Sequence, residues 1–495
     1  MADQVSFLTG IAEDVSTEAR DAHGNSESDL LLPSSGIKLR RELGLIDTLS
    51  FTVGIIIGSG IFTSPGAVLA YAGSVGEGLL SWVAAGVLAL LSVLLFAELG
   101  ASIPVASGSG AYFKIAFGDA WSFAFVWIMF FAIFPGSVNL ISVSFAQYLV
   151  AAISSIDLEP GELSGDVRVK YIAILCIVIL TLCNCAGVRV GAMVQNVLGV
   201  CKMALVSLIV ILGTIFFCRD SSVLKENFTE PFNGSSLPGF GPSMVAALWA
   251  FCGWGDIVFL AEEIKNPEKN IPRASFGAIA IVTFTYLVVN VSYIAVIPYS
   301  EVESSLVVAM DTARAVLGPS GGRLTAVLVA VSLLGTVNAV IMCGGRYLYG
   351  SAKTGEAHRW LGHVSVRTGA PTIALLAQGA WCVFLLFLFS DFLQILNYFG
   401  TASFFIYGLS AVAHIELRRK LPDLHRPYKV PYHPFASVVV VCTCMYMIVS
   451  TVVNDPIHSA YAFLFMILAF PIYYLVVKEW NTRANLDKIL PLLDP

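Results

Sequence analysis

Two short glycine-containing stretches, Gly58-Ser-Gly60 and Cys252-Gly-Trp-Gly255, decide how this sequence folds. Each lies inside a long apolar segment, the first in Asp47–Ala72 and the second in Ser243–Ala261. Glycine permits backbone conformations that interrupt a helix, so each stretch predicts a break in a helix that would otherwise be continuous. We therefore expect two broken helices, one in each half of the chain.

The composition places these helices in a membrane. Of the 495 residues 57% are hydrophobic and 13% are charged, whereas soluble proteins carry about 25% charged residues. About 20 helical residues cross a bilayer core, and open sheets cannot satisfy their backbone groups in lipid. The apolar pattern predicts about twelve transmembrane helices, at Asp47–Ala72, Leu79–Ile103, Trp121–Ile153, Val169–Gly187, Gly191–Phe217, Ser243–Ala261, Ser275–Ile297, Arg323–Ser351, Thr372–Phe389, Phe392–Leu417, Phe435–Val453 and Ser459–Val477.

The ends of the chain differ from this apolar body. We expect a disordered cytosolic N-terminal tail at 1–42, a transmembrane domain at 43–480 and a short cytosolic C-terminal tail at 481–495. The first 35 residues are polar and acidic and lack the hydrophobic region of a signal peptide.

The basic residues predict the orientation. With both termini inside, 19 of the 28 Lys and Arg residues lie on the inner side and six in outer loops, as the positive-inside rule requires. The same topology puts two glycosylation sequons, at Asn227 and Asn233, in one outer loop. We expect a multi-pass protein of the plasma membrane.

Several function classes are excluded or disfavoured. The net charge of −6 is spread along the chain and gives no reason to expect nucleic acid as a partner. The ten cysteines form no CxxC pair, so we expect no metal site. No catalytic triad appears, no cofactor is indicated, and there is no continuous polar lining for a channel. The sequence therefore predicts neither an enzyme nor a pore.

The positions of the two breaks predict a transporter. They fall in the first and sixth spans, which correspond to each other when five helices repeat in inverted orientation. A half-helix that starts at the first break would point its N–H groups at a carboxylate. The half-helix that ends near Trp249 would leave carbonyl groups free for a protonated amine. A zwitterionic amino acid fits both, although Gly58 and Gly60 could instead serve close helix packing alone.

Four motifs extend this interpretation to a family. The chain resembles the L-type amino-acid transporters of the amino acid–polyamine–organocation superfamily, from about Leu43 to Trp480. The resemblance implies an all-α fold with a five-plus-five inverted repeat and two extra C-terminal helices. The motifs that carry it are Gly58-Ser-Gly-Ile-Phe62, Phe96-Ala-Glu-Leu-Gly100, Glu262-Glu-Ile-Lys-Asn-Pro-Glu-Lys-Asn-Ile-Pro272 and Arg426-Pro-Tyr-Lys-Val430.

The resemblance also implies roles for individual residues. The backbone N–H groups of Ser59 and Gly60 would hold the substrate carboxylate, and Trp249 would be an aromatic gate on the outer side. Gly58 and Gly253 would allow the two breaks. The carbonyl groups that would hold the amine are those of Ile56, Trp249 and Cys252.

Lys202 is a charged residue deep inside the fifth span. It lies 13 residues after Arg189 and 16 before Cys218, so each end of the helix is ~20 Å away. A lysine side chain cannot reach that far, so its ammonium group must face the protein interior. By the resemblance Lys202 takes the place of a sodium ion, which implies transport without sodium. The alternative is a lysine that is neutral and merely tolerated.

Other charged residues leave alternatives open. Asp256 either caps the second half-helix, which we favour, or attracts a cationic substrate side chain. Cys252 adds no charge, which favours neutral substrates. We expect Glu98, Glu262, Glu263 and Arg346 to act as ion-pair or gate groups near the inner face.

A departure from the family bears on partners. The loop Ser154–Arg168 contains no cysteine, which excludes a disulfide there to a single-span glycoprotein heavy subunit and leaves a noncovalent partner open. We expect a sodium-independent exchanger or facilitator of neutral L-amino acids that works by alternating access. The alternatives are a proton-coupled or cationic amino-acid transporter, or a membrane-embedded amino-acid sensor.

Overall fold

The computed structural model describes residues 44–58, 60–102, 109–154, 166–186, 188–253, 264–353, 356–365, 368–389 and 391–477. These residues are almost entirely helical and contain no β-strand. Nine of the helices in this part of the chain are long and apolar enough to cross a membrane, and two shorter apolar helices accompany them. The prediction of an all-α polytopic membrane protein is confirmed.

The order of the helices follows the predicted spans. The first half contains α2 (Leu45–Ile56), α3 (Gly60–Ala72), α4 (Val75–Ser102), α6 (Asp119–Ile128), the π-helical turn η1 (Met129–Ile133), α7 (Phe134–Ile153), α8 (Val167–Ala186) and α9 (Val188–Arg219). The second half contains α11 (Leu237–Ala250), α12 (Pro267–Val296), α14 (Val308–Lys353), α15 (Thr372–Leu388), α16 (Phe392–Lys420), α17 (Phe435–Asn454), α18 (Pro456–Ile472) and η4 (Tyr473–Val477). Short connecting helices are α5 (Ser109–Phe117), α10 (Ser222–Asn227), α13 (Tyr299–Ser304) and η3 (Arg359–Gly362).

Two helices start at least eight residues earlier than the apolar pattern predicts. α12 begins at Pro267 instead of Ser275, with a proline at the first helical position, where its missing N–H costs no hydrogen bond. α14 begins at Val308 instead of Arg323 and bends at Gly318, whose φ of 76° suits glycine. Charged residues lower the hydropathy of these first helical segments, so the apolar pattern does not include them. They are Lys269 and Arg273 in α12 and Asp311 and Arg314 in α14.

Some of the prolines inside the helices are compensated by side chains from other helices. A proline has no N–H, so the carbonyl group four residues earlier loses its helical donor. Pro135 frees the carbonyl of Phe131, which accepts from Trp381 Nε1 at 2.9 Å and from the Tyr398 hydroxyl at 2.8 Å. In α11, Pro242 frees the carbonyl of Pro238, whose partners are Ser450 Oγ at 2.6 Å and Asn454 Nδ2 at 2.9 Å. Such compensation is what a membrane interior requires.

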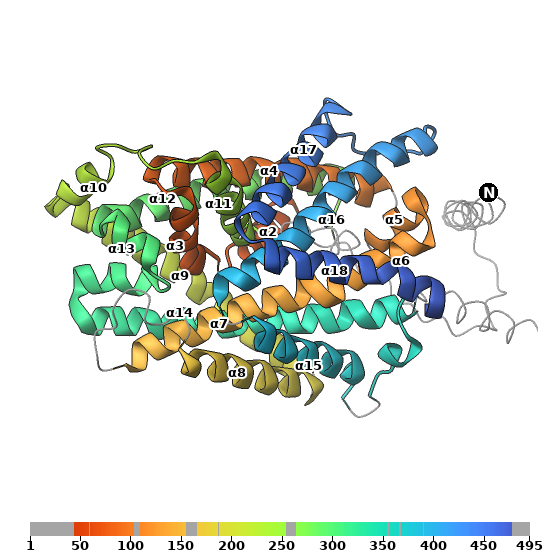
Figure 1. Cartoon of the computed structure of the whole chain (residues 1–495), viewed down its shortest axis with the longest axis horizontal. Helices are drawn as coiled ribbons and strands as arrows, with labels where there is room; N and C mark the ends of the chain where they lie inside the picture. The colour runs from red at the N-terminus through yellow and green to blue at the C-terminus, as the bar shows by residue number, and fades with distance from the viewer. Residues whose placement is uncertain are drawn as a thin grey trace, which may run out of the picture.

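The helices form two groups that matter for the site (Figure 1). One group, here called the bundle, consists of α2, α3, α4, α11 and α12, which pack on one another. The other, here called the scaffold, consists of α7, α8, α14 and α15, which lie together in the lower layer of Figure 1. α9 packs against both α12 of the bundle and α14 of the scaffold. The two predicted helix breaks both fall in the bundle.

Candidate functional site

The first span is broken where the sequence predicts. α2 ends at Ile56 and α3 starts at Gly60. The Ile57 N–H still donates to the carbonyl oxygen of Val53 at 2.9 Å, which closes the last turn of α2. Ser59 lies outside the described residues. The break itself is confirmed, and its use to hold a carboxylate stays a prediction.

In the sixth span, the helix of the described part ends where the sequence predicts a break. α11 ends at Ala250, and the chain turns as Phe251 N–H donates to Leu248 O at 3.0 Å and Cys252 N–H to Trp249 O at 3.1 Å. Gly253 follows with a φ of 102°, a conformation that favours glycine. The residues 254–263 lie outside the described part, and with them the predictions for Asp256, Glu262 and Glu263.

The two breaks touch each other. A Cβ atom on Gly60 would lie 2.4 Å from Cα and 2.6 Å from Cβ of Ala250. No side chain fits in that space, so Gly60 allows the start of α3 to pack directly on the end of α11. Close packing, the alternative to a ligand role, is therefore one real function of Gly60. It also brings the N–H end of α3 beside the carbonyl end of α11.

Tyr286 of α12 joins the same two helix ends. Its hydroxyl lies 3.0 Å from the carbonyl oxygen of Ile56 and 2.8 Å from that of Ala250, so one proton is shared between the two breaks. The side chain is fully buried and packs edge-on against Trp82, with ring centroids 5.5 Å apart. The Ile56 carbonyl, predicted to hold the amine, thus already accepts one hydrogen bond and keeps one lone pair.

Sequence reasoning missed Tyr286, although a signal was present. A tyrosine in the middle of an apolar span brings a hydroxyl group into a region without water, where it needs a partner. The sequence does not say which partner, because Ile56 and Ala250 are far from Tyr286 along the chain.

Trp249 sits one turn from the break in α11. It is 5% exposed, and its ring packs edge-on against Phe392 of α16 at a centroid distance of 5.6 Å. Cys252 and Gly58 are half-buried. The predicted role of Trp249 as a gate stays a prediction, and its burial under α16 is consistent with an outer side that is closed.

Lys202 is buried as expected, at 4% exposed. It lies on α9, which packs between α12 of the bundle and α14 of the scaffold. A lysine in this setting cannot reach the membrane surface, so the prediction that it faces the interior is confirmed. Its role as a substitute for sodium stays a prediction.

Glu98 forms an ion-pair network at the end of α4. Arg418 donates to its two carboxylate oxygens at 2.7 and 2.5 Å, and the Val430 N–H donates at 2.6 Å. Arg426 Nε lies 3.4 Å and His414 Nε2 3.2 Å from the same carboxylate. The prediction that Glu98 is an ion-pair group is confirmed. Arg346, for which the same role was expected, is exposed.

The two glycosylation candidates differ in their surroundings. Asn227 Nδ2 donates to Ile294 O at 2.8 Å and to Ile297 O at 3.2 Å, and its Oδ1 accepts from the Tyr299 N–H at 2.9 Å. A sugar on Nδ2 would replace one of the two donated hydrogens. Asn233 is exposed and donates to Glu230 Oε2 at 2.7 Å, a surface contact that is easily given up.

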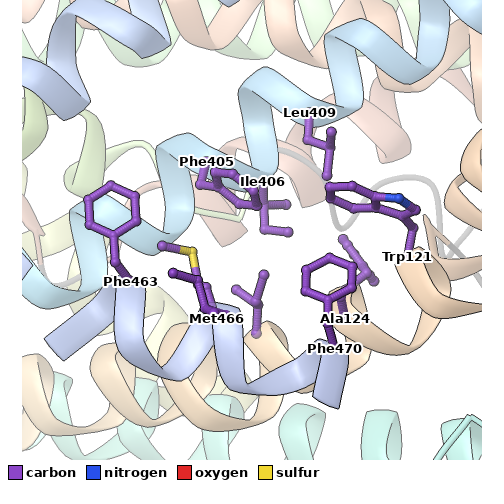
Figure 2. Close-up of a pocket in the computed structure, with 11 residues that line it drawn as sticks. Trp121, Ala124, Phe405, Ile406, Leu409, Phe463, Met466 and Phe470 are labelled. Carbon is purple, nitrogen blue, oxygen red and sulfur yellow. The ribbon is translucent and has the colours of Figure 1, made fainter. Parts of the chain in front are cut away.

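A separate, small cavity of about 70 Å³ lies between α6, α16 and α18 (Figure 2). An amino acid would find no partner there for its charged groups. The cavity is therefore not the candidate site, and it contains none of the predicted site residues. Its lining is apolar throughout, made by Trp121, Ala124, Phe125, Ile128, Phe405, Ile406, Leu409, Phe463, Met466, Ile467 and Phe470.

Comparison with known proteins shows the family of this chain. Residues 43–477 match the amino acid permease family. The chain is 33% identical to the b(0,+)-type amino acid transporter 1 of Mus musculus, over 90% of this chain and 91% of that protein. It is 30% identical to the large neutral amino acids transporter small subunit 2 of Oryctolagus cuniculus, over 96% and 88%. It is 31% identical to the human cystine/glutamate transporter, over 96% and 95%.

The chain belongs to the amino acid permease family and is a membrane transporter of amino acids. The resemblance to the L-type transporters and the expected superfamily are confirmed. The prediction that the chain is not an enzyme is confirmed too, because the family and these relatives are transporters.

Proposed function

We propose that this protein moves neutral L-amino acids by exchange or facilitated transport, without sodium, through alternating access at the junction of α2, α3 and α11. The observation that carries the proposal is the direct contact of the two helix breaks at Gly60 and Ala250. Tyr286 ties the ends of the two half-helices together at the same point.

The backbone at this junction is suited to a zwitterion. The first N–H groups of α3 have no helical partners and carry the positive end of the helix dipole, which favours a carboxylate at Ser59 and Gly60. The last carbonyls of α11 carry the negative end and favour an ammonium group. Trp249 lies in this last turn and Cys252 lies two residues beyond it, and the Trp249 carbonyl already accepts from the Cys252 N–H. Each carbonyl keeps a second lone pair for the substrate amine.

A neutral side chain is the best fit to the described part of the site. Cys252 is uncharged and half-buried, and Phe251 is fully buried beside it. A cationic substrate would need a carboxylate close by, since an unpaired charge in a site of low polarity costs several kcal/mol. We propose that Asp256 caps the second half-helix instead of serving this purpose.

Lys202 takes the place of the coupling ion in this proposal. A fixed ammonium on α9, between α12 and α14, would supply the charge that a bound sodium supplies elsewhere. Uptake by the wild type should then be equal in sodium and choline media, and Lys202→Ala should be strongly impaired. Lys225→Ala, an exposed lysine on α10, is the matched control and should transport normally. A steep sodium requirement in the wild type would contradict the assignment.

The orientation of the transporter, its membrane, its partner and its glycosylation site are proposed from the sequence. The distribution of basic residues favours cytoplasmic termini, with 1–42 and 481–495 as tails, in the plasma membrane. One relative is called a small subunit, which favours a larger partner here as well. Since the loop Ser154–Arg168 has no cysteine, such a partner would bind noncovalently. We propose Asn233, and not Asn227, as the sequon free to be glycosylated.

A further inference from the structure

The hydroxyl group of Tyr148 links α3 to two scaffold helices. Tyr148 lies near the end of α7 and is fully buried. Its hydroxyl donates to the carbonyl oxygen of Phe62 in α3 at 2.6 Å. The same oxygen accepts from the N–H of Ala309, in the first turn of α14, at 3.4 Å. One hydroxyl therefore joins a half-helix of the bundle to both α7 and α14 of the scaffold.

The adjacent carbonyl of α3 is held differently. Pro65 has no N–H, so the carbonyl of Ile61 lacks its helical donor. The hydroxyl of Tyr293 on α12 donates to this carbonyl at 3.3 Å and replaces the missing bond. Tyr293 is also fully buried. Two tyrosines thus hold neighbouring carbonyls of one helix, one from within the bundle and one from the scaffold.

The difference between the two tyrosines matters if the bundle moves. Alternating access in this kind of fold moves one group of helices against the other around a fixed site. The Tyr293 bond stays inside the moving group, whereas the Tyr148 bond crosses between the groups and must break when they separate.

The helices and connecting segments around Tyr148 pack closely in this structure. A Cβ atom on Gly66 of α3 would lie 2.3 Å from the carbonyl oxygen of Ser305, which shows how tightly α3 meets the segment before α14. Trp249 is buried under Phe392 on the same side of the two breaks. In the proposed orientation α7 runs outward, so Tyr148 lies between the site and the outer surface.

We propose that Tyr148 is a positioning residue whose hydroxyl latches the outer gate, stabilising the outward-closed state against the outward-open one. The inference rests on the proposed alternating access. The latch consists of the Phe62 carbonyl, the Tyr148 hydroxyl and the Ala309 N–H. Deleting the hydroxyl removes bonds present in the closed state alone, so it shifts the population toward the open state.

Cys252 offers a native probe of this shift. It is half-buried at the second break, and a membrane-impermeant thiosulfonate reagent added to intact cells reaches it when the outer side is open. The labelling rate then reports the open population. The same chain with Cys252→Ser gives the background from the other cysteines.

The decisive comparison is Tyr148→Phe against Tyr293→Phe. Both remove one buried hydroxyl that binds α3 and keep the aromatic ring. We expect Tyr148→Phe to raise the Cys252-dependent labelling rate about 2- to 12-fold, the effect of one net hydrogen bond on a two-state equilibrium. Tyr293→Phe should leave the rate within twofold of the wild type. Equal rates in the two variants, or no change in Tyr148→Phe, would overturn the proposal.

Two further measurements separate the possible failures. If Tyr148→Phe does not reach the cell surface, Tyr148→Met is read in the same way, because a flexible apolar side chain fills the space without a hydroxyl. A neutral amino acid added outside should slow Cys252 labelling if the substrate binds at the breaks. Absence of this protection would contradict the proposed site, while the comparison of the two tyrosine variants would still decide the latch.

Discussion

Replacing Glu98 by glutamine tests whether the ends of α4 and α16 are held together by charge. The Glu98 side chain is 2% exposed, and those of Arg418 and Arg426 are 20% and 8% exposed. Glutamine keeps the shape of the side chain and one oxygen acceptor but loses the charge. Two guanidinium groups would then remain in a poorly solvated place, and they would lose the counter-ion that they have among the described residues.

The expected cost follows from these contacts. Removing one partner of a buried ion pair destabilises a protein by about 3–5 kcal/mol, because the other charge stays buried. Here the carboxylate accepts two hydrogen bonds from Arg418 and one from the Val430 N–H. We expect the upper half of that range, since Arg426 also lies within 3.4 Å.

Purified protein in detergent should be unfolded by heat or denaturant, with Glu416→Gln as the control. Glu416 pairs with Lys420 on the same helix as Arg418, but at 3.6 Å and with the two side chains 33% and 47% exposed. Such surface pairs contribute about 0.3–0.5 kcal/mol. If Glu98→Gln costs no more free energy of unfolding than Glu416→Gln, the network does not hold the helix ends together.

Three further predictions address the site and the inner loop. Tyr286→Phe should lower the maximal transport rate several-fold with full surface expression, because the Ile56 and Ala250 carbonyls lose their shared donor. Unchanged kinetics would show that Tyr286 has no role in transport. Cys252→Asp should shift competition assays toward cationic amino acids by supplying a carboxylate, and an unchanged preference would place the side-chain pocket elsewhere. Burial, with the positive charges of the Arg418 and Arg426 guanidinium groups, lowers the pKa of His433 to about 4. The unfolded chain, with a histidine pKa of about 6.5, then binds a proton first, so stability should fall as the pH drops from about 6.5 to about 4. Denaturation midpoints measured against pH should show a smaller fall in His433→Gln than in the wild type, and identical profiles would refute this.

Features set by local composition could be predicted from the sequence. The break between Ile56 and Gly60 and the end of α11 at Ala250 follow from glycines within apolar segments. The burial of Lys202 follows from its distance to both helix ends. These properties depend on residues close together in the chain, so one sequence is enough to see them.

Features set by packing could not be predicted. The partners of Tyr286, Tyr148 and Tyr293 are backbone carbonyls on other helices. The residues next to each tyrosine in the sequence do not show which carbonyl it binds. A partial rule does emerge from Pro65 and Pro135. Each frees a carbonyl four residues earlier, and a side chain from another helix then donates to it.

The role of Gly60 illustrates a choice that needed the structure. From the sequence, a ligand cradle and a packing glycine were alternatives. The contact with Ala250 gives Gly60 a packing function whatever the substrate is. A substitution such as Gly60→Val would therefore abolish transport under either interpretation, and variants such as Tyr286→Phe and Cys252→Asp are better tests of the site.

Counterflow into liposomes that contain the purified protein tests the central claim most directly. Liposomes loaded with an unlabelled neutral amino acid should take up the labelled one equally well in sodium and in choline, with the same pH on both sides. Lysine, arginine and glutamate should compete less well than neutral amino acids. Uptake that requires sodium or a pH step, or no uptake of any amino acid by correctly inserted protein, would contradict the account.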